Sequence, residues 1–104
     1  MELTNTETLP NEEIAEVLGI ARGNVVKARN AGRDFTQSLR NITGGELKAY
    51  STLLGDSRDE AIDRMEADAA EMGADAVVNL RLETSEIANG GAEVMAYGTA
   101  VRLE

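Results

Sequence analysis

The sequence predicts an α+β fold in which helices cover one face of an antiparallel β-sheet, in the order β-α-β-β. Three observations carry this prediction: a strand-like stretch from residue 14, a long amphipathic pattern in the middle, and two strand-like stretches that end the chain. With 104 residues, the chain has the usual size of one domain, so we expect a single domain over 1–104.

The first strand is predicted over Ile14 to Ala21, where apolar residues occupy both faces. Gly19 and Gly23 indicate bulges or the close approach of another backbone. A short helix should follow, because Phe35, Leu39 and Ile42 recur at helical spacing. Its start resembles a capping box formed by Asp34 and Gln37, and Gly44-Gly45 should end it.

A longer helix is predicted from about Glu46 to Met72. One side is apolar, and its members are Leu54, Ala61, Ile62, Met65, Ala69 and Met72. The weak point is Gly55-Asp56-Ser57, where a new helix could begin, but we favour one continuous helix. Gly73 is well placed for a left-handed C-terminal cap.

Two strands joined by a turn should complete the fold. In Ala76 to Thr84, the side chains of Val78, Leu80 and Leu82 are expected on one face. Asn89-Gly90-Gly91 is a turn signal, and the strand from Glu93 to Leu103 is apolar on both faces. Two helices can cover only one face of this sheet, so we expect the other face to meet another subunit.

Composition excludes several classes of site. The chain has neither cysteine nor histidine, which removes thiolate nucleophiles, disulfides, sulfur-based zinc sites and the commonest metal ligand. The start of the chain lacks a basic region followed by an apolar stretch, and no apolar run is long enough to span a bilayer. We therefore expect a cytoplasmic protein.

The net charge is −9, which argues against nucleic acid or an anionic membrane as a partner. Only Lys27 and Lys48 are lysines, against eight arginines and 19 acidic residues, a composition typical of proteins adapted to high salt. Yet six basic and two acidic residues lie between Arg22 and Lys48. We interpret this basic segment as a surface that docks on the acidic surface of a neighbouring subunit, with an anionic ligand or plain solvation as alternatives.

Other candidates have simpler explanations. Arg58 lies at the edge of the apolar side of the long helix, where an ion pair is expected in preference to a ligand contact. Gly44 and Gly45 could hold an anion on backbone amides, although a helix cap and turn explains them. Four helix carboxylates could hold a hard cation, but a solvated acidic face is the simpler interpretation: Asp56, Asp59, Glu60 and Asp63. Tyr50 and the hydroxyl residues lack a base that would make them nucleophiles.

The order and spacing of several short pieces resemble the YbjQ-like family of small uncharacterised proteins over nearly the whole chain. The matching pieces are Leu18-Gly19-Ile20, Gly23, Asn30, Arg33-Asp34-Phe35, Arg40, Gly44-Gly45, Ala49-Tyr50, Leu54, Arg58, Gly73 to Val78, and Gly98 to Val101.

The resemblance implies a dodecin-like subunit, with helices on one face of a β-α-β-β sheet, assembled into a homopentameric ring. The family carries a label of heavy-metal binding, for which only the methionines offer soft ligands here. Family members usually have Arg after the glycine pair and Glu after the tyrosine, where this chain has Glu46 and Ser51.

Three functional hypotheses follow. The first is a ring-forming protein without catalytic activity that binds a small anionic molecule or a metal ion at subunit junctions, with these candidate residues: Arg33, Asp34, Arg40, Gly44, Gly45, Tyr50 and Arg58. The second is an enzyme with a shared intersubunit site that uses Arg33, Tyr50 and, as its base, Asp34. The third is a purely structural or protein-interaction module. The sequence identifies no cofactor.

Overall fold

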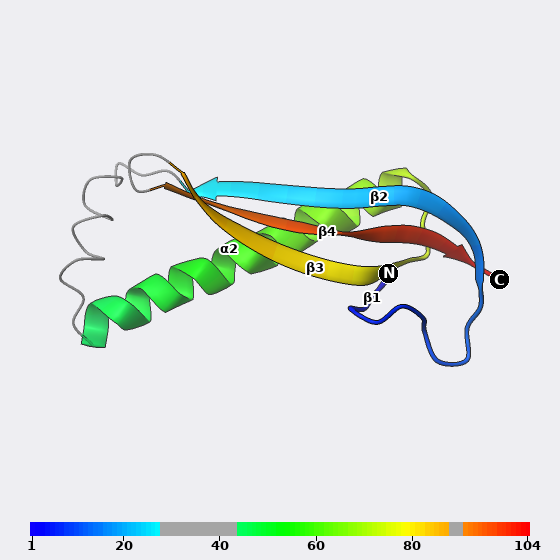
Figure 1. Ribbon diagram of the computed structural model, residues 1–104, viewed down its shortest axis with the longest axis horizontal. Coiled ribbons are helices and arrows are strands. Elements are labelled where there is room, and N and C mark those ends of the chain that lie inside the picture. The colour runs from blue at the N-terminus through cyan, green and yellow to red at the C-terminus, as the bar shows by residue number, and fades with distance from the viewer. Residues whose placement is uncertain (28–43, 88–90) are drawn as a thin grey trace.

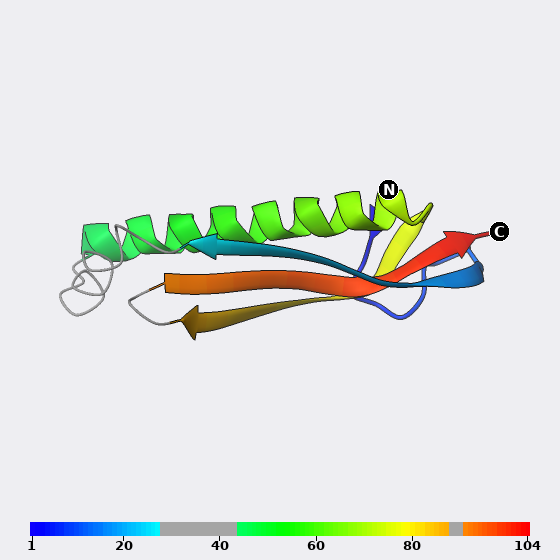
Figure 2. The same ribbon diagram turned by 90° about the horizontal axis from the view of Figure 1, so that it is seen from above.

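The computed structural model describes residues 1–27, 44–87 and 91–104. Its elements are β1 (Glu2–Leu3), β2 (Ile14–Lys27), α2 (Gly44–Glu71), β3 (Ala76–Ile87) and β4 (Gly91–Leu103). The strands form one sheet in the order β1-β3-β4-β2, and α2 lies along one face of it (Figures 1 and 2). The predicted α+β class is therefore confirmed. The short helix expected around Phe35 to Ile42 lies outside the described residues.

The sheet is mixed, which differs from the purely antiparallel expectation. β2 and β3 both pair antiparallel with β4, whereas β1 pairs parallel with β3, with Glu2 opposite Ala76. The extra strand comes from the polar start of the chain, which has no apolar alternation that could have predicted it.

α2 is one continuous helix, as predicted, and it passes through Gly55 without a break. Ser57 does not cap a new helix; its buried hydroxyl donates a 2.9 Å hydrogen bond to the carbonyl of Leu53, one turn earlier. Gly44 and Gly45 are the first residues of α2, and the short helix that they were expected to end lies outside the described residues.

The C-terminal end of α2 has the predicted glycine cap. Gly73 adopts a φ of 83°, the amide of Ala74 bonds to the carbonyl of Ala69, and the amide of Gly73 bonds to the carbonyl of Ala70. These two bonds define a Schellman motif, which satisfies carbonyls that the helix end would leave free.

The main core lies between α2 and the sheet and consists of small side chains. Its buried members are Ala21, Val25, Ala61, Met65, Ala69, Val77, Val94, Ala96 and Ala100. Gly23 lets the helix approach most closely, because a Cβ there would collide with the backbone carbonyl of Ala61 and the backbone nitrogen of Met65. This confirms the close backbone approach predicted from the glycine.

The strand pairing has three register shifts, one of them between Ile14 and Glu16. The other two bear on the sequence predictions. In β2 the register shifts between Val17 and Gly19, the bulge that the glycine predicted. In β3 it shifts between Val78 and Arg81, with Asn79 at a φ of 54°. The expectation that Val78 shares a face with Leu80 and Leu82 is therefore wrong, because the extra residue reverses the alternation.

Val78 instead belongs to a second, smaller core on the opposite face. It packs there with Ala76 and Val101, and the cluster is covered by Leu9 and Ile14. Residues 1–13 thus close one end of the sheet face that α2 leaves uncovered. Backbone bonds hold this N-terminal segment in place, since the carbonyls of Thr4 and Thr6 accept from the amides of Leu80 and Asn79.

Candidate functional site

The rest of the face opposite α2, called the open face below, is the main surface that the described chain leaves uncovered. Ala21, Gly23 and Val25 of β2 face the helix and are buried. Side chains alternate along a strand, so Ile20, Arg22, Asn24 and Val26 point to the open face. Their cross-strand partners on β4 are Thr99, Tyr97, Met95 and Glu93.

Apolar side chains on the open face are solvent-exposed to an unusual degree. Val17 is 64% exposed, Ile20 62% and Val26 53%, all on the edge strand β2. Exposed apolar side chains that share one sheet face can be buried by another protein surface. This supports the sequence prediction that the strand is apolar on both faces.

A shallow cavity of about 230 Å³ lies in the open face. Three adjacent strands line it: Ile20 and Arg22 come from β2, Met95 and Tyr97 from β4, and Glu83 from β3. Arg22 lies opposite Tyr97, and Glu83 lies opposite Met95. A cation and an anion therefore flank a floor made by an aromatic ring and a thioether.

The polar groups of this cavity are available to a ligand. Within the described part of the chain, the side chains of Arg22, Glu83 and Tyr97 form no hydrogen bond or ion pair. Two other arginines are engaged: Arg102 pairs with Glu16 at 2.9 Å, and Arg81 donates to the carbonyl of Asn5 at 2.9 Å.

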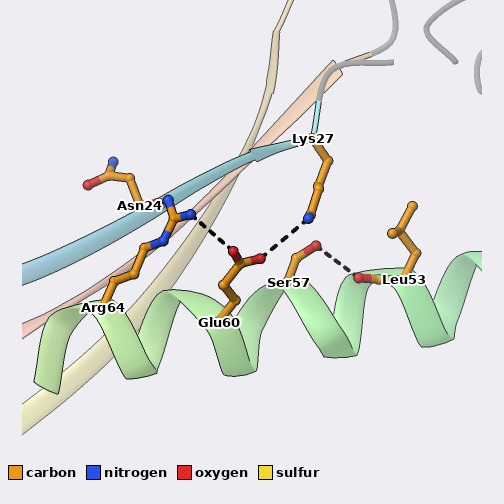
Figure 3. A network of polar contacts seen from close by, with 6 residues as sticks. All are labelled: Asn24, Lys27, Leu53, Ser57, Glu60 and Arg64. Carbon is orange, nitrogen blue, oxygen red and sulfur yellow. Dashed lines mark hydrogen bonds and ion pairs between the residues drawn. The ribbon is translucent and has the colours of Figure 1, made fainter. Parts of the chain in front are cut away.

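On the other side of the sheet, a polar network joins α2 to the edge of β2. Glu60 accepts from Arg64 at 3.0 Å and pairs with Lys27 at 3.3 Å (Figure 3). Arg64 also donates to the backbone carbonyl of Asn24 at 2.6 Å. Glu60 and Arg64, four residues apart on α2, thus form a surface pair that takes part in holding the helix against the edge strand.

Among the described residues, the cavity lining includes Arg22 of the basic segment and none of the other residues singled out from the sequence. Arg33, Asp34 and Arg40 lie outside the described residues. Gly44, Gly45 and Tyr50 belong to the first two turns of α2.

Arg58 lies on α2, across the sheet from the open face. Its side chain is exposed and has no ion pair among residues 1–27, 44–87 and 91–104, so the expected structural ion pair is not observed there.

Sequence reasoning missed Glu83, Met95 and Tyr97 as a group. The apolar pattern of the two C-terminal strands predicts only which residues share a face, and it does not relate Glu83 to Met95 or Tyr97. The available signal was that the last strand carries Met95 and Tyr97 on one face, which in the structure is the face opposite α2.

Two further site types find no support in the described chain. No group of three acidic side chains there could hold a metal ion. No helix among the described residues is long and apolar enough to cross a membrane.

Comparison with known proteins gives close relatives of the same length. A UPF0145 protein of Halobacterium salinarum is 74% identical over 103 residues, covering 99% of both chains. One of Natronomonas pharaonis is 72% identical with the same coverage. One of Archaeoglobus fulgidus is 52% identical over 101 residues, covering 97% of this chain and 94% of the relative.

A solved structure has the same fold at low sequence identity. It is the crystal structure of a protein of unknown function from Pediococcus pentosaceus, assigned to the DUF74 family. Its TM-score is 0.61 at 18% identity, with 100% of this chain and 98% of that chain covered. The family model described as "Putative heavy-metal-binding" matches residues 1–104, and with these relatives it shows that the chain belongs to the YbjQ (UPF0145) family.

Proposed function

We propose that this chain is a ring-forming homo-oligomer without catalytic activity, which binds a small molecule at the junctions between its copies. The observation that carries the proposal is the open face, where Val17, Ile20 and Val26 are each more than half exposed. Burying such side chains against another copy is favourable at about 25 cal/mol per Å² of apolar surface.

The surface that fits the open face is the outer side of α2. Asp56, Asp59 and Asp63 are exposed there, whereas the open face carries the cations Arg22 and Arg81 beside the carboxylates Glu83 and Glu93, so the attraction rests on the two arginines. Opposite charges on two different surfaces favour a head-to-tail contact between copies. Such a contact repeats from copy to copy and closes into a ring when the rotation allows it. The family resemblance favours five copies.

Heavy-metal binding, which the family description names, does not fit the donors of this chain. Cysteine and histidine are absent from the sequence. Met65 is fully buried in the core, and Met72 packs against that core. Met95 lines the cavity, but its lining offers Glu83 as the only carboxylate, and soft metals need several sulfur or imidazole ligands.

The enzyme hypothesis is left as a prediction, because Arg33 and Asp34 lie outside the described residues. Nothing in the described geometry favours it over a binding role, since the cavity holds no nucleophile paired with a base.

The assembly is tested by placing a charge on the open face. Ile20→Glu should dissociate the ring, because a carboxylate there would be buried without a partner. Leu82→Glu is the matched control, since Leu82 is 40% exposed but pairs with Ala96 on the helix side of the sheet. Light scattering after size-exclusion chromatography reports the mass of each variant.

Two outcomes count against the proposal. One is an unchanged mass for Ile20→Glu, and the other is an equal loss of mass in both variants. The acidic half of the contact is tested by Asp59→Lys with Asp63→Lys, which should also reduce the mass if the outer side of α2 is the complementary surface.

A further inference from the structure

The cavity in the open face has the features of a small-molecule site, and only Arg22 of its lining belongs to the basic segment singled out from the sequence. At about 230 Å³ it is smaller than the roughly 300–1,000 Å³ of pockets that take drug-sized ligands. Its lining combines two apolar side chains, Ile20 and Met95, with three polar ones. A few polar groups on an apolar floor are the usual composition of a binding site.

The two charges of the cavity restrict what could bind. Arg22 is on β2 and Glu83 is on β3, on either side of β4. Since adjacent strands lie about 5 Å apart, the two backbones are separated by roughly 10 Å, a gap that both long side chains can lean across. A simple anion would bind Arg22 but leave Glu83 repelled, and a simple cation would have the reverse defect.

A ligand that carries both charges satisfies both side chains. Arg22 presents a planar guanidinium suited to a carboxylate, and the Tyr97 hydroxyl, on the residue directly opposite, can donate to the same group. Glu83 can accept from an ammonium group. Ile20 and Met95 then provide the contact for an apolar side chain.

We propose that this cavity binds a small apolar zwitterion of the α-amino-acid kind, with its carboxylate on Arg22 and Tyr97 and its ammonium group on Glu83. The inference rests on the proposed function in one respect: in the single chain the cavity is open, and a neighbouring copy packed on the open face would cover it. Covering would exclude water and strengthen both charge contacts.

Three probes of one shape test the charge requirement. L-leucine carries both charges, 4-methylpentanoate lacks the ammonium group, and 3-methylbutylamine lacks the carboxylate. Isothermal titration of the assembled full-length protein should give measurable binding for leucine. The other two probes should bind at least several-fold more weakly. Absence of leucine binding, or equal binding of all three probes, overturns the proposal.

Variants assign each charge to its residue. Arg22→Gln should weaken leucine binding by roughly tenfold, the loss expected for a charge-assisted hydrogen bond. Glu83→Gln should weaken leucine but leave 4-methylpentanoate unchanged or improved. The matched control is Arg102→Gln, which removes an exposed arginine paired with Glu16 far from the cavity. Leucine binding that is unaltered in both cavity variants contradicts the assignment.

The mass of each sample, measured alongside, separates this inference from the assembly. A monomer that binds leucine through Arg22 and Glu83 would refute the ring and keep the site. A ring that does not bind leucine would support the assembly and refute the site. If Arg22→Gln also changes the mass, Tyr97→Phe removes one hydroxyl at constant shape, and it must still weaken leucine binding for the proposal to stand.

Discussion

Arg64 of α2 donates a 2.6 Å hydrogen bond to the backbone carbonyl of Asn24, on the outer edge of the edge strand β2. One turn further along the helix, Asp68 accepts a 3.0 Å bond from the backbone amide of Arg22. Side chains of the helix thus occupy edge groups that would otherwise be free to pair with another strand. Such blocking is a recognised protection against edge-to-edge aggregation.

Loss of this contact should therefore be measurable. Arg64→Gln should lower the free energy of unfolding by about 1 kcal/mol, because it removes a charge-assisted bond to Asn24 and the contact with Glu60. Arg58→Gln, on the same helix, is the control and should change it by less than about 0.5 kcal/mol. Urea titration followed by circular dichroism measures both. Equal effects would show that the edge contact contributes nothing specific.

Two glycines give opposite predictions for the same substitution. Gly23→Ala should destabilise by about 1–3 kcal/mol, because its methyl group collides with the α2 backbone at Ala61 and Met65. Gly55→Ala should stabilise by about 0.5–1 kcal/mol, since it lies inside the helix with nothing within 4 Å of the added carbon. Thermal unfolding of the two variants separates them. If Gly23→Ala were neutral, the close helix–sheet contact described above would be wrong.

The N-terminal segment should respond to pH. A hydrogen bond with the carboxyl group of Glu2 raises the pKa of Glu12 above its ordinary value of 4.5, with slight desolvation and the charge of Glu2 acting in the same direction. Because the pKa of Glu12 is higher in the folded state than in the unfolded state, its protonated carboxyl group stabilises the fold below pH 4.5. This stabilisation is lost as the pH rises through the raised value.

Glu12→Gln mimics the protonated carboxyl group. The stability of this variant relative to the parent protein should therefore grow as the pH rises above 4.5. Unfolding midpoints measured over a series of pH values report this difference, and Glu13→Gln on the neighbouring exposed residue is the control. A difference that stays constant with pH would count against the carboxyl pair.

The absence of soft ligands predicts weak metal binding. Titration with Cd²⁺ should show no stoichiometric site of submicromolar affinity, because the chain has no thiolate or imidazole and buries Met65. The measurement is isothermal titration in chelator-free buffer, with Met95→Leu as the control for the thioether that lines the cavity. A tight site abolished by Met95→Leu would show that the cavity holds a metal.

Much of the fold was predictable because its signals are local. The long helix, the Gly73 cap, the bulge at Gly19 and the close approach at Gly23 each follow from a residue whose conformational preference is strong. The bulge at Asn79 was missed because the apolar alternation of Val78, Leu80 and Leu82 argued against it. Its signal was the asparagine, which tolerates the left-handed conformation.

The candidate site was less predictable, because it is made by strand register. Arg22, Glu83 and Tyr97 are brought together by pairing between three strands, and no spacing along the chain encodes their proximity. The N-terminal segment escaped prediction for a similar reason. Its hold on β3 is mostly backbone bonding at Thr4 and Thr6, which leaves no side-chain pattern.

The central claim is that copies of this chain assemble through the open face, and native mass spectrometry tests it most directly. The account predicts a closed assembly with the mass of several copies, five by the family resemblance, when the protein is purified without chelators. A monomer at micromolar concentration would contradict the account.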